Sequence, residues 1–104
     1  MWIQRLDENA RIPTKWSKLA AGHDLYSIEN ILIPANNRAL VKIGLAITVP
    51  EGTHGRIVPR SGLATKGTTV DAGVVDADYG GEVKVQLVNH GKLDYEVKIG
   101  ERIA

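Results

Sequence analysis

Residues 82–89 alternate apolar and polar side chains, and this pattern limits the possible folds of the chain more than any other feature. Successive side chains of a β-strand point to opposite faces, so Val83, Val85 and Leu87 would lie on one face and Lys84 on the other. The same alternation recurs over residues 93–99, where we expect a second strand with one buried face. Half-buried strands of this kind need a sheet and a core to pack against.

The remainder of the chain predicts further short strands joined by tight turns. Eleven glycines, four prolines and many valines and isoleucines are typical of an all-β protein. The Asn36-Asn37 pair predicts a turn, and Gly44 is expected to separate two strands. A short helix is expected over residues 63–66, and residues 68–70 and 73–75 are expected to be the two arms of a β-hairpin. The other expected strands are 2–6, 31–33, 38–42, 45–49 and 55–58.

Length and composition exclude several classes of protein. The 104 residues are sufficient for one domain, residues 1–104, with a single modest core. A formal charge of +1 gives no general reason to bind nucleic acid or an anionic membrane. The absence of cysteine excludes disulfides and thiolate zinc sites. No apolar stretch approaches the roughly 20 residues that span a bilayer, and no signal peptide is apparent, so we expect a soluble intracellular protein.

The turn Arg60-Ser61-Gly62 is a candidate phosphate site. Backbone amides at the start of a helix, a guanidinium group and a hydroxyl are good donors to phosphate oxygens. The alternative from the residues alone is that Ser61 only caps the short helix and Arg60 is a solvated surface cation.

Asp76 is the candidate catalytic residue. A carboxylate near a phosphate site is repelled by it, and a plausible task for such a group is to hold and deprotonate a water that attacks phosphorus. The segment DADYGGE, residues 76–82, also suggests a calcium loop. The calcium-loop interpretation fails because the glutamate expected at loop position 12 would fall on Leu87.

Four sequence motifs, in this order, resemble those of the deoxyuridine triphosphate nucleotidohydrolases, or dUTPases. The motifs are AAGHDLYS (20–27), PRSGLA (59–64), AGVVDADYGGEVKVQLVN (72–89) and GERIA (100–104). The resemblance covers nearly the whole chain, which stops within the fourth motif and lacks the glycine-rich fifth. It implies a distorted jelly-roll-like β-barrel of the β-clip class and a homotrimer. Its active sites would lie between subunits, combining residues 60–62 of one chain with residues 73–79 of another.

The resemblance also implies hydrolysis of dUTP to dUMP and pyrophosphate. Asp76 would be the general base, and Arg60, Ser61 and Gly62 would bind the phosphates. Asp24 would orient the water shell of the Mg²⁺ that accompanies the triphosphate. Arg102 is either a structural cation or a phosphate ligand.

The resemblance further implies residues that would bind the base and the sugar of the nucleotide. Uracil would be bound by backbone groups of Gly73 and Val74, with Lys84 on the returning strand. Tyr79 would pack against the 2′ carbon of the deoxyribose and exclude a ribose hydroxyl.

Two other functions are compatible with these motifs. A dCTP deaminase relative would need an additional acid-base carboxylate near the base, for which the sequence has no motif. A catalytically weak nucleotide-binding or protein-interaction module is the other alternative, favoured by the absence of the glycine-rich segment that would close over the substrate.

Overall fold

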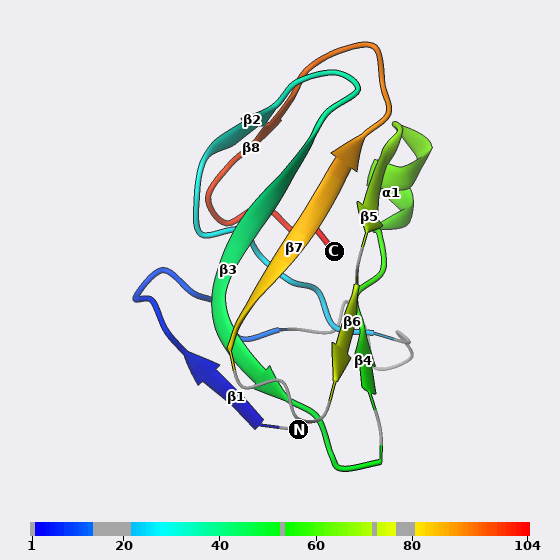
Figure 1. Ribbon diagram of the computed structural model, residues 1–104. Coiled ribbons are helices and arrows are strands. Elements are labelled where there is room, and N and C mark those ends of the chain that lie inside the picture. Colours follow the sequence, from blue (N-terminus) through cyan, green and yellow to red (C-terminus); the bar gives the residue numbers. More distant parts are fainter. Residues whose placement is uncertain (1, 14–21, 53, 72, 77–80) are drawn as a thin grey trace.

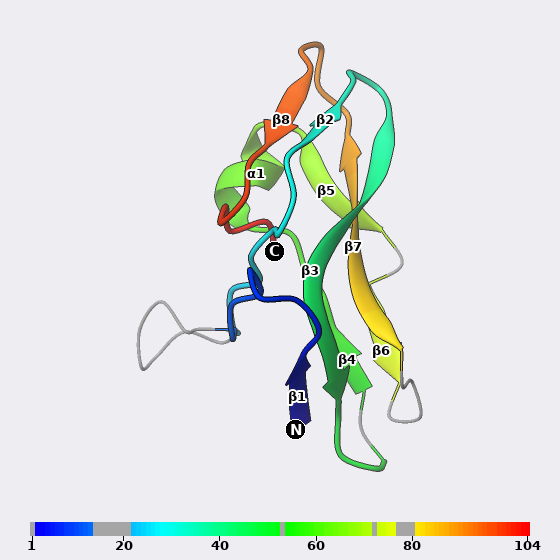
Figure 2. The same cartoon turned by 90° about the vertical axis from the view of Figure 1, so that its left-hand side faces the viewer.

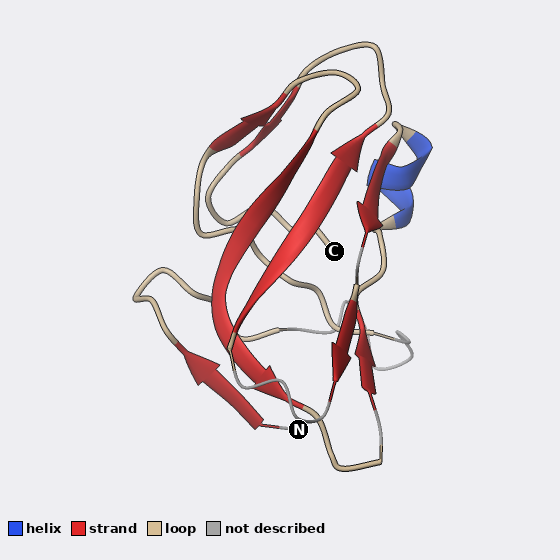
Figure 3. Cartoon of the chain, viewed as in Figure 1, coloured by secondary structure: helices blue, strands red, loops and turns tan. Residues whose placement is uncertain are grey.

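The computed structural model describes residues 2–13, 22–52, 54–71, 73–76 and 81–104. These residues are mostly strands, with one short helix, as expected for an all-β fold (Figure 3). In chain order the elements are β1 (Trp2–Arg5), β2 (Ile31–Ile33), β3 (Arg38–Thr48), β4 (His54–Arg56), α1 (Ser61–Thr65), β5 (Thr68–Asp71), β6 (Val74–Asp76), β7 (Glu82–Asn89) and β8 (Tyr95–Val97).

The strands form two layers that enclose one core. A four-stranded antiparallel sheet has the order β1-β3-β7-β5, and two smaller pairs are β2-β8 and β4-β6. The β2-β8 pair lies across from β3 and β7, while α1 lies beside β5 (Figures 1 and 2). Buried residues of β2, β8 and the segment 101–104 pack in one cluster with those of β3 and β7.

The inner face of the β3-β7 ladder confirms the alternation predicted for residues 82–89. Side chains at every second position of each strand are at most 3% exposed: Val41, Ile43, Leu45, Val83, Val85 and Leu87. Burying an aliphatic side chain of this size contributes about 1.5–3 kcal/mol. Lys84 is exposed on the other face, as predicted.

Residues 38–48 form a single strand, so the prediction of two strands separated at Gly44 is wrong. The register with β7 shifts between Lys42 and Leu45, which marks a β-bulge at this glycine. Gly44 has a φ of +70° and its carbonyl accepts a hydrogen bond from the Leu6 amide at 2.8 Å. The bulge bends β3 without ending it, and β1 pairs with the portion beyond it.

The predicted hairpin between residues 68–70 and 73–75 is also wrong. β5 pairs with β7, and β6 pairs with β4, so the two expected arms belong to different sheets. The chain passes from one sheet to the other at Gly73, whose carbonyl accepts a hydrogen bond from the Ile57 amide at 2.5 Å.

The strand predicted over residues 93–99 is shorter in the structure. β8 contains only Tyr95–Val97, and Val97 is its one fully buried side chain. Leu93 is 82% exposed and Ile99 is 52% exposed, because they lie in the loops on either side of β8. The alternation in the sequence therefore extends beyond the paired residues.

The buried Asn89 joins the two layers at the end of β7. Its amide group donates to the carbonyls of Ile33 at 3.0 Å and Leu93 at 2.9 Å, and its side-chain oxygen accepts from the Gly91 amide. These bonds satisfy a side chain that is only 2% exposed. The turn at Asn36 was predicted correctly: this residue has a φ of +59°, which asparagine tolerates. In the part of the chain that the structure describes, no helix is long and apolar enough to span a bilayer.

Replacing Gly44 by alanine is expected to lower the free energy of unfolding by about 2–4 kcal/mol, through strain at positive φ and through crowding. An added Cβ would lie 2.9 Å from Ala10 Cβ and 3.1 Å from Asp7 Cβ. Gly52→Ala is the matched control, since its φ is +81° and nothing lies within 4 Å of an added Cβ. Urea denaturation of both variants measures the difference, and equal losses would contradict the crowding at the bulge.

Candidate active site

Residues 25–27 and residues 100–104 lie side by side and bring two of the sequence motifs together. The Leu25 amide donates to the Ala104 carbonyl at 3.1 Å, and the Ile103 amide donates back to Leu25 at 2.9 Å. Ser27 makes the equivalent exchange with Glu101 and Gly100. Asp24 and Arg102 are therefore positioned by backbone pairing that spans more than 70 residues of sequence.

Asp24, Arg60 and Arg102 form one half-buried polar cluster. Arg102 Nη1 lies 3.3 Å from Asp24 Oδ2, with the two side chains 38% and 21% exposed, respectively. Arg60 Nη1 donates to the carbonyl oxygen of Arg102 at 3.3 Å. A partly solvated ion pair of this kind contributes at most about 1 kcal/mol, so its value lies in the placement of charge rather than in stability.

Tyr95 and Glu101 extend this cluster, and neither residue belonged to the predicted site. The Tyr95 hydroxyl donates to Glu101 Oε2 at 2.5 Å. Burial, followed by the neighbouring Glu101 carboxylate, raises the pKa of Tyr95 well above its usual value, while Arg60 acts in the opposite direction. The hydroxyl therefore stays protonated. Glu101 stands directly before Arg102 in the GERIA motif, and this adjacency was the available signal.

A charged cavity of about 620 Å³ adjoins the cluster, between α1 and the loop before β8. Its walls carry Arg60, Lys66 and Lys92 together with Asp94, Tyr95 and Glu101. Among these groups, Asp94 accepts a hydrogen bond from the Ala35 amide.

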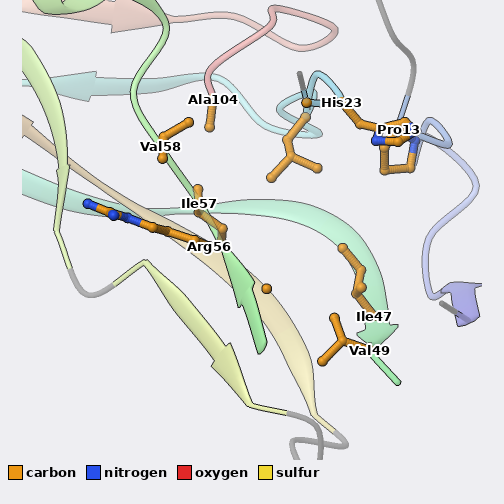
Figure 4. A pocket seen from close by; sticks show the side chains of 11 residues that line it. Pro13, His23, Ile47, Val49, Arg56, Ile57, Val58 and Ala104 are labelled. Carbon is orange, nitrogen blue, oxygen red and sulfur yellow. The ribbon is translucent and has the colours of Figure 1, made fainter. Parts of the chain in front are cut away.

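A second cavity, of about 240 Å³, is mostly apolar and is lined in part by the end of the 101–104 segment (Figure 4). Ile47, Val49, Ile57, Val58 and Ala104 contribute to its lining, with His23 and Arg56 as the ionisable members. This lining suits hydrocarbon and offers few donors to phosphate. More of the charged side chains line the cavity beside the polar cluster than line this one.

The predicted phosphate turn is exposed at the start of α1. The helix begins at Ser61, two residues earlier than predicted, and Arg60 is its N-cap residue without a side-chain capping bond. The alternative in which Ser61 caps the helix is therefore wrong. An added Cβ at Gly62 would have nothing within 4 Å, so this glycine is not required by packing within the chain.

Of the other predicted site residues, Val74 and Asp76 lie on β6 and Gly73 lies directly before it. Val74 pairs with Arg56 and Asp76 pairs with His54 across the β4-β6 ladder. Gly73 lies against Ile57, the residue after β4, and an added Cβ would be 2.3 Å from the Ile57 carbonyl oxygen. Tyr79 lies outside the described residues. Lys84 is exposed on β7, directly opposite Lys42 of β3.

The structure thus divides the predicted site into two parts. Asp24, Arg60, Ser61, Gly62 and Arg102 lie around α1 and the 101–104 segment. β6 lies towards the opposite end of the molecule from α1 in both views (Figures 1 and 2).

The described residues contain no group of three or more His, Asp or Glu side chains that could hold a metal. Asp24 is a single carboxylate, already paired with Arg102. This arrangement fits a Mg²⁺ that is carried mainly by phosphate oxygens and water, with one carboxylate reaching its water shell.

The fold and the polar cluster together define an all-β protein with a half-buried group of charged side chains beside an exposed turn. The chain matches the family model of dUTPase over residues 8–104. The chain belongs to the dUTPase family.

Curated relatives are similar over most of this chain. The deoxyuridine 5'-triphosphate nucleotidohydrolase of Yarrowia lipolytica is 57% identical over 100 residues, which cover 95% of this chain and 64% of the relative. The enzyme of the same name from Candida albicans is 58% identical over 95 residues, covering 90% and 60%, respectively. The chain thus spans less than two thirds of the length of these two relatives.

Solved dUTPase structures share the fold. A mutant dUTPase from phage phi11 of S. aureus superimposes with a TM-score of 0.91 at 25% identity, covering 99% of this chain and 85% of that one. That structure is described as showing the coordination of a structural Mg(II) ion. A dUTPase mutant of Staphylococcus bacteriophage 80alpha with dUpNHpp gives a TM-score of 0.92 at 26% identity, covering 99% and 78%. The predicted jelly-roll-like fold and the predicted family are confirmed.

Gly62→Ala and Gly73→Ala are expected to act in different ways. Gly73→Ala should lower the melting temperature, because its Cβ would overlap the Ile57 carbonyl. Gly62→Ala should leave the melting temperature nearly unchanged but weaken polyphosphate binding by about tenfold, if phosphate approaches this turn closely. Thermal melts and calorimetric titration with tripolyphosphate measure both effects. Unchanged binding in Gly62→Ala would contradict the assignment of the turn.

Proposed function

We propose that this chain hydrolyses dUTP to dUMP and pyrophosphate, as the names of its relatives describe for those proteins. The observation that carries the proposal is the convergence of Asp24, Arg60 and Arg102 from three separate motifs into one cluster. This cluster lies beside the exposed turn at Ser61 and Gly62. Together the cluster and the turn would supply guanidinium and amide donors to a triphosphate.

The phosphate chain would bind at the α1 turn. Arg60 and the amides of Ser61 and Gly62 would donate to its oxygens, and the Ser61 hydroxyl would add a further donor. Arg102 would hold Asp24 in place and complete the positive rim of the site. When bound with the triphosphate, Mg²⁺ would neutralise developing negative charge on its oxygens, and Asp24 would orient the surrounding water.

The β6 region would recognise the base and the sugar of the nucleotide. The backbone of Gly73 and Val74 would hydrogen-bond the uracil edge, with Lys84 on the returning strand and Tyr79 against the deoxyribose. A wrong base would leave buried polar groups unpaired, and this is the main source of discrimination in such a site. Asp76 would accept a proton from the water that attacks the α-phosphorus, and the phosphorus–oxygen bond to the leaving pyrophosphate would break.

We further propose that the complete site is built between chains of a homotrimer. The separation of α1 from β6 within one chain supports this arrangement, since residues 60–62 would meet residues 73–79 of a neighbouring copy. Three identical sites would result from one repeated heterologous contact that closes after three subunits.

Asp76→Asn is expected to reduce kcat for dUTP by about 10²-fold or more while preserving affinity, because only the base is lost. Pyrophosphate release from dUTP, dTTP, dCTP and UTP, with Mg²⁺ present, measures rate and selectivity. Asp71→Asn, the same change on the exposed end of β5, is the matched control.

Selective dUTP turnover that is lost in Asp76→Asn but not in Asp71→Asn supports the proposal. Binding of dUTP without turnover by the unaltered chain would instead indicate a nucleotide-binding module. Ammonia release from dCTP would indicate a deaminase.

Mixing two inactive variants tests the site between chains. Ser61→Ala and Asp76→Asn chains, unfolded together and refolded, should recover about a quarter of the sites if each site uses two neighbouring subunits of a ring. Turnover that stays at the level of the separate variants would place both residues on the same chain's site. Light scattering on the mixture reports the assembly itself.

A further inference from the structure

The polar cluster around Arg60 contains two carboxylates, Asp24 and Glu101, and only Asp24 is paired with a cation among the described residues. Asp24 is paired with Arg102, whose carbonyl accepts a hydrogen bond from Arg60. Glu101 lines the same cavity as Arg60, yet in the described part of the chain these two side chains form no ion pair. Glu101 instead accepts the Tyr95 hydroxyl at 2.5 Å.

A free carboxylate at this position would compete with a phosphate for Arg60. Guanidinium groups form bidentate bonds with either anion, and a half-buried pair would hold the guanidinium away from the α1 turn. The orientation of the Glu101 side chain therefore determines whether the Arg60 guanidinium can bind a phosphate.

We propose that the Tyr95 hydroxyl restrains Glu101 from pairing with Arg60 and so keeps this guanidinium available to the phosphates. Tyr95 is a positioning residue in this arrangement, since it acts on the substrate only through Glu101 and Arg60. The proposal rests on the proposed function, in which Arg60 binds phosphate.

The surroundings of Glu101 and Tyr95 fit this role. The backbone of Glu101 is held at both ends, since its amide donates to Lys98 and its carbonyl accepts from Ser27. Its side chain is then oriented mainly by what its carboxylate contacts. Burial and the adjacent carboxylate raise the pKa of Tyr95, so the hydroxyl remains a donor throughout the neutral and mildly alkaline range.

A double-variant cycle separates this role from a purely structural one. Tyr95→Phe keeps the ring and removes only the hydroxyl, so it should weaken inorganic tripolyphosphate binding about 3- to 10-fold, the scale of one hydrogen-bonded contact. Glu101→Gln alone should bind as tightly as the unaltered chain or more tightly. The double variant Tyr95→Phe/Glu101→Gln should bind like Glu101→Gln, because the competing charge is gone.

Calorimetric titration with tripolyphosphate gives the affinities, and the KM for dUTP should follow the same order with little change in kcat. Melting temperatures of the four proteins report any general loss of structure. A structural role for the hydroxyl predicts that the double variant is as weak as Tyr95→Phe. That result would overturn the proposal, and so would equal affinities of the unaltered chain and Tyr95→Phe. Weak tripolyphosphate binding by Glu101→Gln alone, or no such binding by the unaltered chain, would also overturn it. Tripolyphosphate binding without dUTP turnover would count against the proposed function alone.

Discussion

The packing of the apolar side chains of β3 and β7 into one core is the constraint on which the rest of the structure depends. Their inner faces are excluded from water over most of the ladder, and β2, β8 and the 101–104 segment pack against them. A shift of the register by one residue would turn these side chains outward and place lysines inside. The bulge at Gly44 adds residues to β3 while returning Leu45 to the inner face. The register of β7 also sets the position of β5, the strand after α1, because β5 pairs with β7.

Local patterns predicted the strands well but did not predict their partners. The alternation in residues 82–89 identified β7, because that strand has one buried face along its whole length. Gly44 was interpreted as a strand end, since a bulge and a break both favour glycine in sequence. The false hairpin at residues 68–75 has a related cause: two short strands close in sequence suggest pairing, whereas β5 and β6 pair with distant strands. Leu93 and Ile99 continue an alternation that no partner strand accepts.

The candidate site also combines residues that short sequence motifs predict with contacts that only the folded chain shows. Motif resemblance identified Asp24, Arg60 and Arg102, but only the folded chain shows that Arg102 pairs with Asp24 and receives Arg60 on its carbonyl. The alternation over residues 93–99 predicted Tyr95 only as a strand residue. Its hydrogen-bonding partner, Glu101, lies beyond β8 and a turn, so the alternation gave no sign of this contact. The role of Asp76 stays a prediction that rests on resemblance, since the structure places its backbone on β6, away from the α1 turn.

The exchange of hydrogen bonds between residues 25–27 and 100–104 has a consequence for the order of folding. Closing a loop of more than 70 residues costs entropy before any bond is gained, so this pairing is expected to form after the β3-β7 ladder has restricted the chain. The residues concerned also leave the ribosome at very different times. Asp24 and Arg102 would thus meet only when the core is largely built, and their ion pair would not exist in partly folded chains.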